Sequence, residues 1–202
     1  FSTYAAKNFK SKVEAITISK AQFEYASNKI QKEGLSEKVS IKFKDYREIE
    51  KQYSNIVSIE MFEAVGKKYW EKYFDVVKNS LANSGKAVLQ IITIDGKRSF
   101  EYQNQPDFIQ QYIFPGGMLP SKKELTEINQ KAGLDFKEIK SFGLSYAKTL
   151  NLWNKQFQES WQDLVKLGFN DRFKRMWEFY LAYCETGFIS KSTDVSHFLI
   201  NK

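Results

Sequence analysis

The run AVLQIITI, from Ala87 to Ile94, decides the fold class, because it is a nearly unbroken stretch of apolar and β-branched residues. A strand covered by helices on both faces has this composition, whereas a strand with one face in water alternates apolar and polar residues. A similar run, NIVSI, covers Asn55 to Ile59. Between the two runs, Lys68 to Leu81 carries apolar residues at helical spacing, with Gly85 as the expected stop. Strand, helix and strand in this order predict a parallel unit of an α/β sheet.

The alternation of strands and helices extends in both directions along the chain. The other expected elements are helices over Phe1–Phe9 and Lys20–Lys32, the latter capped by Ser19, and strands over Val13–Ile18, Val39–Phe43, Phe136–Phe142 and Asp194–Ile200. The pattern predicts a mainly parallel, doubly wound sheet. In such a sheet, ligands bind beyond the carboxyl ends of the strands.

The composition is that of a folded α/β protein. The chain has 202 residues, of which 42% are apolar, and it contains no internal repeat or linker, so residues 1–202 are expected to form one domain. The single cysteine, Cys184, excludes an intrachain disulfide and a multi-thiolate metal site. No metal site is expected, and the only histidine, His197, is interpreted as structural.

The charge balance narrows the class of partner. The formal net charge of +7 favours contact with an anionic surface, either nucleic acid or phospholipid. No helix-turn-helix, zinc-finger or RNP-like motif is present, so a basic nucleic-acid-binding module is the minor alternative. No apolar run is long enough to span a bilayer and no leader opens the sequence, which predicts a cytoplasmic protein.

Five segments together resemble one known family. They are TISKAQ (Thr17–Gln22), SIEMFEAVG (Ser58–Gly66), YIFPGGMLPS (Tyr112–Ser121), FGLSYAKTL (Phe142–Leu150) and RFKRMWEFYLAYCETGF (Arg172–Phe188). In this order, over essentially the whole chain, they resemble the cyclopropane-fatty-acyl-phospholipid synthases, which are S-adenosylmethionine-dependent enzymes related to the mycolic acid cyclopropane synthases. The resemblance implies the Rossmann-like, seven-stranded methyltransferase sheet, with a helical acyl-chain-binding insertion over about residues 96–190. It also implies that the family's first strand and glycine-rich cofactor loop are missing here.

The resemblance implies an enzyme of the methyltransferase class that adds a methylene group to the cis double bond of unsaturated phospholipid acyl chains, forming a cyclopropane ring. Methylation of another lipid or of a small acceptor is the alternative. Phospholipid at the inner face of the membrane is the expected partner, through peripheral contact, and a homodimer is an option. Candidate headgroup contacts, for which a solvated helix face is the other interpretation, are Lys122, Lys123, Arg172, Lys174 and Arg175.

Two segments that follow predicted strands are expected to hold the S-adenosylmethionine. The resemblance assigns this role to Thr17, Ile18, Ser19 and Gln22 after the first strand, and to Asp45 and Tyr46 after the second. Polar groups at neighbouring strand ends can clamp a ribose and an adenine. The alternative is that Ser19 only caps a helix and Tyr46 only packs.

For the base, the resemblance implies a bound bicarbonate held by Glu63, Gln90, Tyr146 and the backbone of Ile92. Glu63 follows an apolar strand and is expected to be buried with an altered pKa, although a surface or capping glutamate fits the pattern too. Gln90 departs from the family, where many relatives have histidine. Glutamine can hold an anion by hydrogen bonds but cannot carry the proton at neutral pH. Tyr146 is expected to donate to the anion, with a packed core tyrosine as the alternative.

Cys184 matches a cysteine that the family places at its active site. The implied chemistry needs no protein nucleophile, because the alkene attacks the sulfonium methyl, so Cys184 is expected to line the site or pack within its helix. Some of the aromatic residues are expected to form an apolar slot, and the rest to be core. The candidates are Phe114, Phe142, Tyr146, Trp153, Trp177, Phe179, Tyr180 and Tyr183.

Overall fold

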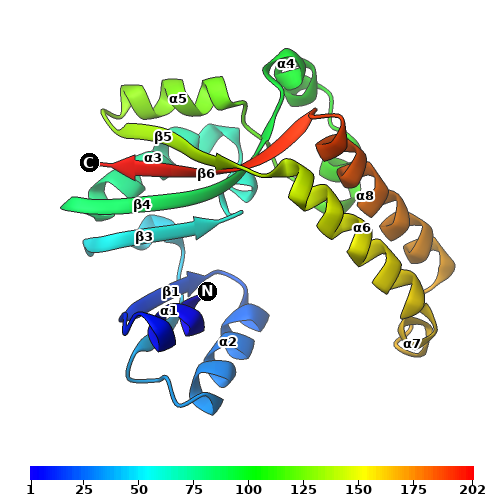
Figure 1. Cartoon of the computed structure of the whole chain (residues 1–202), viewed down its shortest axis with the longest axis horizontal. Helices are drawn as coiled ribbons and strands as arrows, with labels where there is room; N and C mark the ends of the chain where they lie inside the picture. The colour runs from blue at the N-terminus through cyan, green and yellow to red at the C-terminus, as the bar shows by residue number, and fades with distance from the viewer. The chain divides into compact units, whose positions relative to one another are not determined.

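The computed structural model describes every residue from Phe1 to Lys202, and the chain divides into two compact units. The first unit comprises Phe1–Lys51 and the second comprises Gln52–Lys202. Their elements are drawn in Figure 1. That residues 1–202 act as one domain stays a prediction.

The first unit is a small α/β layer. It contains α1 (Ser2–Asn8), β1 (Val13–Thr17), α2 (Lys20–Lys32), β2 (Val39–Phe43) and the short 3-10 helix η1 (Tyr46–Glu48). The predicted parallel pairing is confirmed, with Val13 opposite Val39 and Thr17 opposite Phe43. This register brings the carboxyl ends of both strands to one edge.

The second unit is built on a four-stranded sheet in the order β3-β4-β6-β5. Its strands are β3 (Tyr53–Ile59), β4 (Leu81–Ile94), β5 (Asp135–Ser141) and β6 (Thr193–Asn201). Its helices are α3 (Trp70–Ser80), α4 (Gly96–Asn104), α5 (Lys122–Lys131), α6 (Gly143–Glu159), α7 (Trp161–Lys166) and α8 (Asp171–Ile189), with short turns η2 (Phe62–Ala64), η3 (Lys67–Tyr69) and η4 (Ile109–Ile113).

The sheet of the second unit is mainly parallel, as predicted, because β3, β4 and β5 run in one direction, and the exception is β6. β3 and β4 are parallel, but β6 runs antiparallel to both β4 and β5. The reason is the route of the chain, because the helical hairpin of α6 and α8 returns it so that β6 enters the sheet from the opposite end (Figure 1).

β4 is the strand on which the site is built. It pairs with β3 on one side and β6 on the other. Alternate residues Ala87, Leu89 and Ile91 are fully buried, while Gln90 and Ile92 share the opposite face. Both apolar runs are predicted to be strands covered by helices on both faces. This prediction fits β4 better than β3. β3 is the edge strand of this sheet, and its Val57 is 43% exposed.

Gly85 has a different role from the predicted one. The helix α3 already ends at Ser80, and Gly85 lies inside β4. A Cβ atom there would lie 2.8 Å from Leu81 Cδ1 and 2.9 Å from the Ser54 carbonyl oxygen. The pairing of β3 and β4 shifts register beside this point, between Tyr53 and Asn55. The glycine therefore permits a close backbone approach at an irregular strand pair.

The segment from Gly96 to Ile189 divides its elements between two places. α5 and β5 belong to the layers of the sheet, whereas α6 and α8 pack on each other beyond its end (Figure 1). The core of this hairpin is formed by Ala147 and Leu150 of α6, Leu181 and Phe188 of α8, and Val195 of β6. None of the helices combines the length and the apolar composition needed to cross a membrane.

Candidate active site

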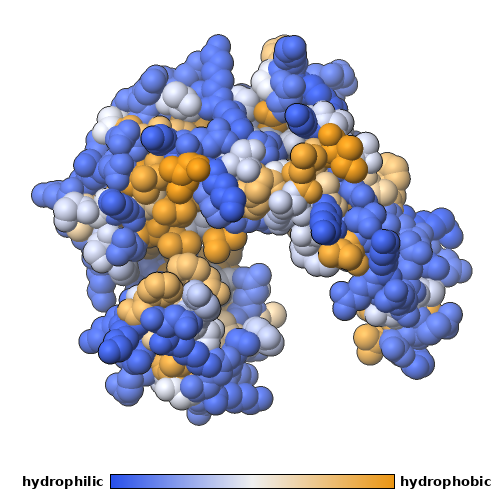
Figure 2. Space-filling model, in the orientation of Figure 1, coloured by the Kyte–Doolittle hydropathy of each residue, from blue (hydrophilic) through white to orange (hydrophobic).

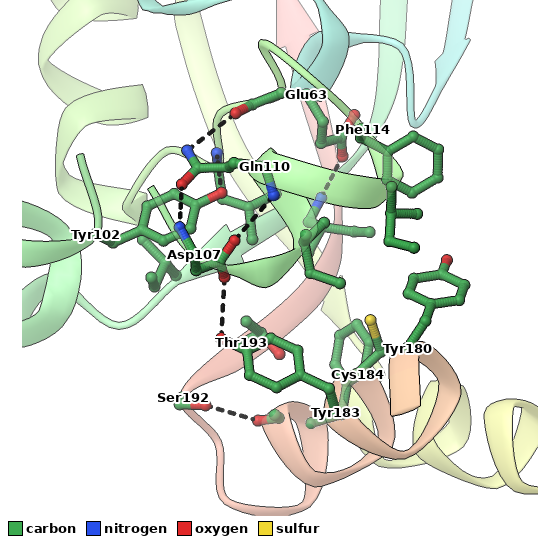
Figure 3. Close-up of a pocket in the computed structure, with 18 of the residues that line it drawn as sticks. Glu63, Tyr102, Asp107, Gln110, Phe114, Tyr180, Tyr183, Cys184, Ser192 and Thr193 are labelled. Atoms are coloured by element: carbon green, nitrogen blue, oxygen red, sulfur yellow. Dashed lines mark hydrogen bonds between the residues drawn. The ribbon is translucent and has the colours of Figure 1, made fainter. Parts of the chain in front are cut away.

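A cavity of about 830 Å³ opens in the second unit, between the end of the sheet and α8. Figure 3 shows Glu63 on one side of it and Tyr180, Tyr183 and Cys184 of α8 on another. Phe114, from the loop after η4, completes the aromatic part of the lining. A cavity of this size with mostly apolar walls fits an apolar ligand.

Glu63 lies in η2, directly after β3, and its carboxylate is buried. Its Oε1 atom accepts a 2.6 Å hydrogen bond from the amide of Ile92, and its Oε2 atom has no partner. Pairing of β3 with β4 ends at Ile59 and Gln90, so the Ile92 amide lies past the end of β3 and can bind Glu63. The side chain caps no helix, which excludes the capping alternative.

Burial raises the pKa of Glu63 from 4.5 to about 7. The amide of Ile92 opposes the shift, and the negative charge of Glu60 adds to it. A carboxyl group whose pKa lies near neutrality can hold or release a proton at physiological pH.

Glu60 is a site residue that sequence analysis missed. It follows β3 directly and has a φ of +51°, a conformation that non-glycine residues rarely adopt. Its Oε1 atom accepts hydrogen bonds from Gln90 Nε2 at 2.7 Å and from the Tyr146 hydroxyl at 2.6 Å. Its position directly behind a strand end, within the same SIEMFEAVG segment as Glu63, was the available signal.

Gln90 is held in one orientation by its neighbours. The β4–β6 register places it opposite His197, whose Nε2 lies 2.9 Å from Gln90 Oε1. That imidazole nitrogen donates, because Gln90 Oε1 can only accept. The amide nitrogen of Gln90 therefore points to Glu60. The contact from His197 thus orients the Gln90 side chain, which agrees with the structural role predicted for this histidine.

Tyr146 reaches the same carboxylate from α6. Its hydroxyl donates to Glu60, and its ring packs against Phe188 at 5.1 Å between centroids. Burial, and then the hydrogen bond and charge of Glu60, raise the pKa of Tyr146 well above its ordinary value. The hydroxyl therefore keeps its proton and acts as a donor.

The residues expected to hold bicarbonate do not fit that anion. Gln90 and Tyr146 both donate to Glu60, and the Ile92 amide donates to Glu63. The donors are already directed at carboxylates of the chain itself. A bicarbonate placed among them would face two acidic side chains and would have to compete for every one of these bonds.

Cys184 lines the cavity from α8 and is half-buried. Burial raises the pKa of its thiol to about 12, and the charge of Asp107 adds to the shift. The sulfur is therefore protonated at neutral pH and is a weak nucleophile. This position agrees with a lining role.

The aromatic candidates divide into two groups. Phe114, Phe179, Tyr180 and Tyr183 line the cavity. Phe142, Tyr146 and Trp177 pack against the core of the hairpin, whereas Trp153 is about half exposed. Roughly half of the predicted slot is therefore core or surface, because aromatic residues at helical spacing do not reveal which face of the helix meets a cavity.

The far end of the cavity is polar. Asp107 accepts hydrogen bonds there from the Tyr183 hydroxyl at 2.9 Å and from the backbone amide of Gln110 at 3.0 Å (Figure 3). Tyr102 donates no side-chain bond to these residues, but its hydroxyl accepts from the Leu119 amide. No sequence pattern pointed to Tyr102, Asp107 or Gln110 as lining residues.

The predicted cofactor residues lie in the first unit, at the common edge of β1 and β2. The Thr17 hydroxyl donates to Gln22 Oε1 at 2.8 Å, and Ser19 caps α2 by accepting from the Gln22 amide. After β2, Asp45 caps η1 and pairs with Arg47 at 2.7 Å.

These side chains fit the chemistry of S-adenosylmethionine. The hydroxyls, the amide and the Asp45 carboxylate suit ribose hydroxyls and ring nitrogens, and Ile18, at 71% exposed, offers an apolar contact for a base. Ser19 caps α2, as the alternative interpretation predicts. Capping uses its hydroxyl oxygen only as an acceptor, so the hydroxyl hydrogen can still be donated to a ligand. Tyr46 belongs to η1 and is half-buried.

Curated relatives cover nearly all of this chain. It is 38% identical over 184 residues to the tuberculostearic acid methyltransferase of Mycobacterium tuberculosis, which covers 91% of this chain and 43% of that protein. It is 34% identical over 185 residues to the cyclopropane-fatty-acyl-phospholipid synthase of Escherichia coli, covering 92% of this chain and 46% of that protein. The chain thus spans a little less than half the length of these relatives.

Solved structures share the fold. A mycolic acid cyclopropane synthase complexed with SAH and CTAB superposes with a TM-score of 0.90 at 24% identity, covering 99% of this chain and 73% of that one. A cyclopropane synthase from Mycobacterium tuberculosis gives 0.90 at 23% identity, with the same coverage. These likenesses establish the methyltransferase fold expected from the sequence. The family model described as mycolic acid cyclopropane synthetase matches residues 1–198, so the chain belongs to this family.

Proposed function

We propose that this chain carries the catalytic part of an S-adenosylmethionine-dependent transferase that adds one carbon to a double bond in a lipid acyl chain. The single observation that carries the proposal is the pair of carboxylates, Glu60 and Glu63, at the wall of an otherwise apolar and aromatic cavity. Family membership agrees with this class of reaction.

The cavity suits an acyl chain rather than a polar acceptor. Phe114, Phe179, Tyr180 and the side chain of Ile92 present apolar surface to it. Apolar walls exclude water, which would otherwise capture a positively charged intermediate. The faces of the aromatic rings also attract positive charge as it develops on the acyl chain.

The residues at the common edge of β1 and β2 would bind the cofactor. Thr17, Ser19, Gln22 and Asp45 would hold the nucleoside part of S-adenosylmethionine by hydrogen bonds. When bound, S-adenosylmethionine supplies an electrophilic methyl group. The negative charge on the carboxylate pair then stabilises the cation left on the acyl chain, and one carboxylate oxygen accepts a proton from the transferred carbon.

The proposed product is a cyclopropane ring, as in the name of the relative from Escherichia coli. Simple methylation is the second candidate, and one observation favours it: the more similar relative, at 38% identity, is named a methyltransferase. Loss of a proton from the transferred methyl closes a ring, whereas loss from a neighbouring carbon leaves a branched alkene of equal mass. The cyclopropane protons in an NMR spectrum of the extracted lipid separate these products.

The test is conversion of unsaturated phospholipid by the full-length protein with S-adenosylmethionine. We expect addition of one CH2 to the acyl chain, and Glu63→Gln should reduce the rate by about two to three orders of magnitude. Glu71→Gln is the matched control, because that side chain on α3 is largely exposed, with only a loose ion pair to Lys131 at 3.8 Å. An unchanged rate in Glu63→Gln would remove this residue from the mechanism.

Phospholipid as the substrate would require contact with a membrane surface, and we assign that contact to the end of the helical hairpin. Val165, Leu167 and Phe169 are exposed there, next to the basic residues Arg172 and Arg175. Figure 2 shows apolar atoms beside α7 among hydrophilic neighbours. Apolar side chains flanked by positive charge suit an anionic lipid interface.

The other basic candidates suit this role less well. Lys122 is engaged by Glu138 at 2.6 Å and Asp194 at 2.8 Å. Lys174 lies over the ring of Trp161 at 5.4 Å. Lys123 is well exposed but lies on α5, outside the hairpin. Peripheral association with the cytoplasmic face of the membrane is proposed on the basis of Arg172 and Arg175.

A further inference from the structure

We infer that the carboxylate of Glu60 is the base of this reaction, built into the chain in place of an exogenous bicarbonate. The inference rests on the proposed function, since it names the group that takes the proton. It begins from the mismatch at the site, where the donors expected to hold an external anion bind a glutamate instead.

The geometry of the Glu60 carboxylate suits a base. Glu60 lines the cavity, and both of its side-chain hydrogen bonds, from Gln90 and Tyr146, end on Oε1. The second oxygen, Oε2, is left for a proton from the substrate. Two strong donors on one oxygen fix the carboxylate plane, as a base that must meet a particular C–H bond requires.

The backbone of Glu60 is held in an unusual conformation. At φ +51° this residue occupies a conformation that favours glycine, which costs conformational energy in any other residue. Its own amide donates to the Gln90 carbonyl oxygen at 2.9 Å, so backbone and side chain are both tied to Gln90. A strained residue held by this many contacts at the rim of a cavity is typical of a functional position.

The side chains around Glu60 are less suited to take the proton. Gln90 cannot accept a proton on its amide nitrogen, and the Tyr146 hydroxyl keeps its own. Burial, with a smaller contribution from the charge of Glu60, raises the pKa of Glu63 to about 7, so only about half of this group is ionised at neutral pH. Among these groups, Glu60 is the carboxylate on which both donors converge.

The step balances without an outside reagent. Once the acyl chain carries the transferred methyl group, the neighbouring carbon bears a positive charge. Oε2 of Glu60 removes one proton from that methyl group, and the electron pair of the broken C–H bond forms the third side of the ring. Glu60 is then a neutral acid, and it returns its proton to water when the product leaves.

The first arm of the test needs no turnover. Melting temperatures of the full-length protein are measured in a buffer prepared without carbonate. Two additions to this buffer are compared at equal ionic strength, sodium bicarbonate and sodium chloride. We expect no bicarbonate-specific shift in the wild type, because Gln90 and Tyr146 are already engaged. Glu60→Gly frees both donors and relieves the positive φ, so this variant should fold and be stabilised specifically by bicarbonate. A specific shift in the wild type, or none in Glu60→Gly, would overturn the inference.

The second arm measures conversion of the acyl chain under the same conditions. The wild-type rate should not respond to bicarbonate, and Glu60→Gln, which keeps an acceptor but loses the charge, should fall by about 100-fold or more. Glu60→Gly should be equally slow and recover with added bicarbonate or formate. A wild type that requires bicarbonate, or a fully active Glu60→Gln, would contradict the inference.

The two arms separate this inference from the proposed function. If the wild type converts no unsaturated lipid, the proposed function fails, and the assignment of Glu60 as base for that reaction fails with it. The melting arm still reports whether Glu60 fills the anion site. A bicarbonate-specific shift in Glu60→Gly beside an active, bicarbonate-independent wild type is the result that supports both.

Discussion

Tyr146 donates a 2.6 Å hydrogen bond to Glu60, a residue that lies 86 positions earlier in the chain. Glu60 follows β3, and Tyr146 lies near the start of α6. The bond therefore joins the helical hairpin to the carboxyl end of the sheet. Since Gln90 of β4 donates to the same oxygen, three elements meet at one carboxylate. The hairpin is thus part of the proposed catalytic arrangement as well as a wall of the cavity.

Tyr146→Phe should lower both activity and stability. The change leaves the ring packed on Phe188 but removes one of the two donors to Glu60. Loss of a hydrogen bond to a charged group costs about 1.5 to 3 kcal/mol, and the looser carboxylate should lower kcat more than it raises KM. Chemical denaturation and initial rates check this. Tyr112→Phe, at an exposed tyrosine of η4, is the control, and equal effects in both variants would contradict the argument.

Glu63 should make stability fall as pH rises. Its pKa is raised from 4.5 to about 7 in the folded protein, so the folded state holds a proton that the unfolded state releases. The stabilisation is complete below pH 4.5 and is lost as pH rises through 7, with a difference of about 3 kcal/mol. Glu63→Gln removes this titration.

Urea denaturation at pH 5 and pH 8 measures that effect. The wild type should lose stability between these values relative to Glu63→Gln, which should be the more stable of the two at pH 8 while being nearly inactive. A stabilised but inactive variant is the expected behaviour of a carboxylate kept in an unfavourable place for function. The same pH dependence in both proteins would show that Glu63 titrates normally.

The sequence was sufficient to predict most elements of the fold. Apolar, β-branched runs marked β3 and β4, and the N-cap Ser19 marked the start of α2. It was not sufficient for the direction of β6, because an alternating strand pattern is the same whether its neighbour is parallel or antiparallel. Gly85 was interpreted as a helix stop because a local pattern does not reveal the close approach of Ser54.

The candidate site was predictable only in part. The SIEMFEAVG segment pointed to Glu63, and the family resemblance pointed to Gln90 and Tyr146. Glu60 follows β3 directly, which was a signal, but its partners Gln90 and Tyr146 lie 30 and 86 positions away in the chain, so its hydrogen bonds could not be predicted from the local sequence. Asp107 was missed as well, since its partner Tyr183 lies 76 positions away.

Cys184 should prove dispensable for the chemistry. Its thiol pKa is raised to about 12, so almost no thiolate is present at neutral pH. Cys184→Ala should keep the rate within a few-fold of the wild type, with a modest loss of stability from reduced packing in α8. Alkylation by iodoacetamide at pH 7.5 should also be slow. A loss of activity as large as that of Glu63→Gln would show that the sulfur takes part in the reaction.

The end of the helical hairpin should govern binding to anionic membranes. Leu167 is 76% exposed, and Arg172 and Arg175 lie close behind it in sequence. Each basic residue near an anionic surface contributes about 1 kcal/mol, so replacing both arginines by glutamate should weaken vesicle binding by at least about tenfold. Leu167→Asp should also weaken it, because the change removes an apolar contact and adds a negative charge that the vesicle repels.

Sedimentation with phosphatidylglycerol vesicles at several salt concentrations measures these affinities. Lys123→Glu is the control for each single arginine reversal, because it reverses one exposed charge on α5, outside the hairpin. If Lys123→Glu weakens binding as much as the hairpin variants do, net charge and not the hairpin attracts the membrane. If the hairpin variants bind normally and Lys123→Glu does not, the contact lies near α5 instead, where Lys122 is held by Glu138 and Asp194.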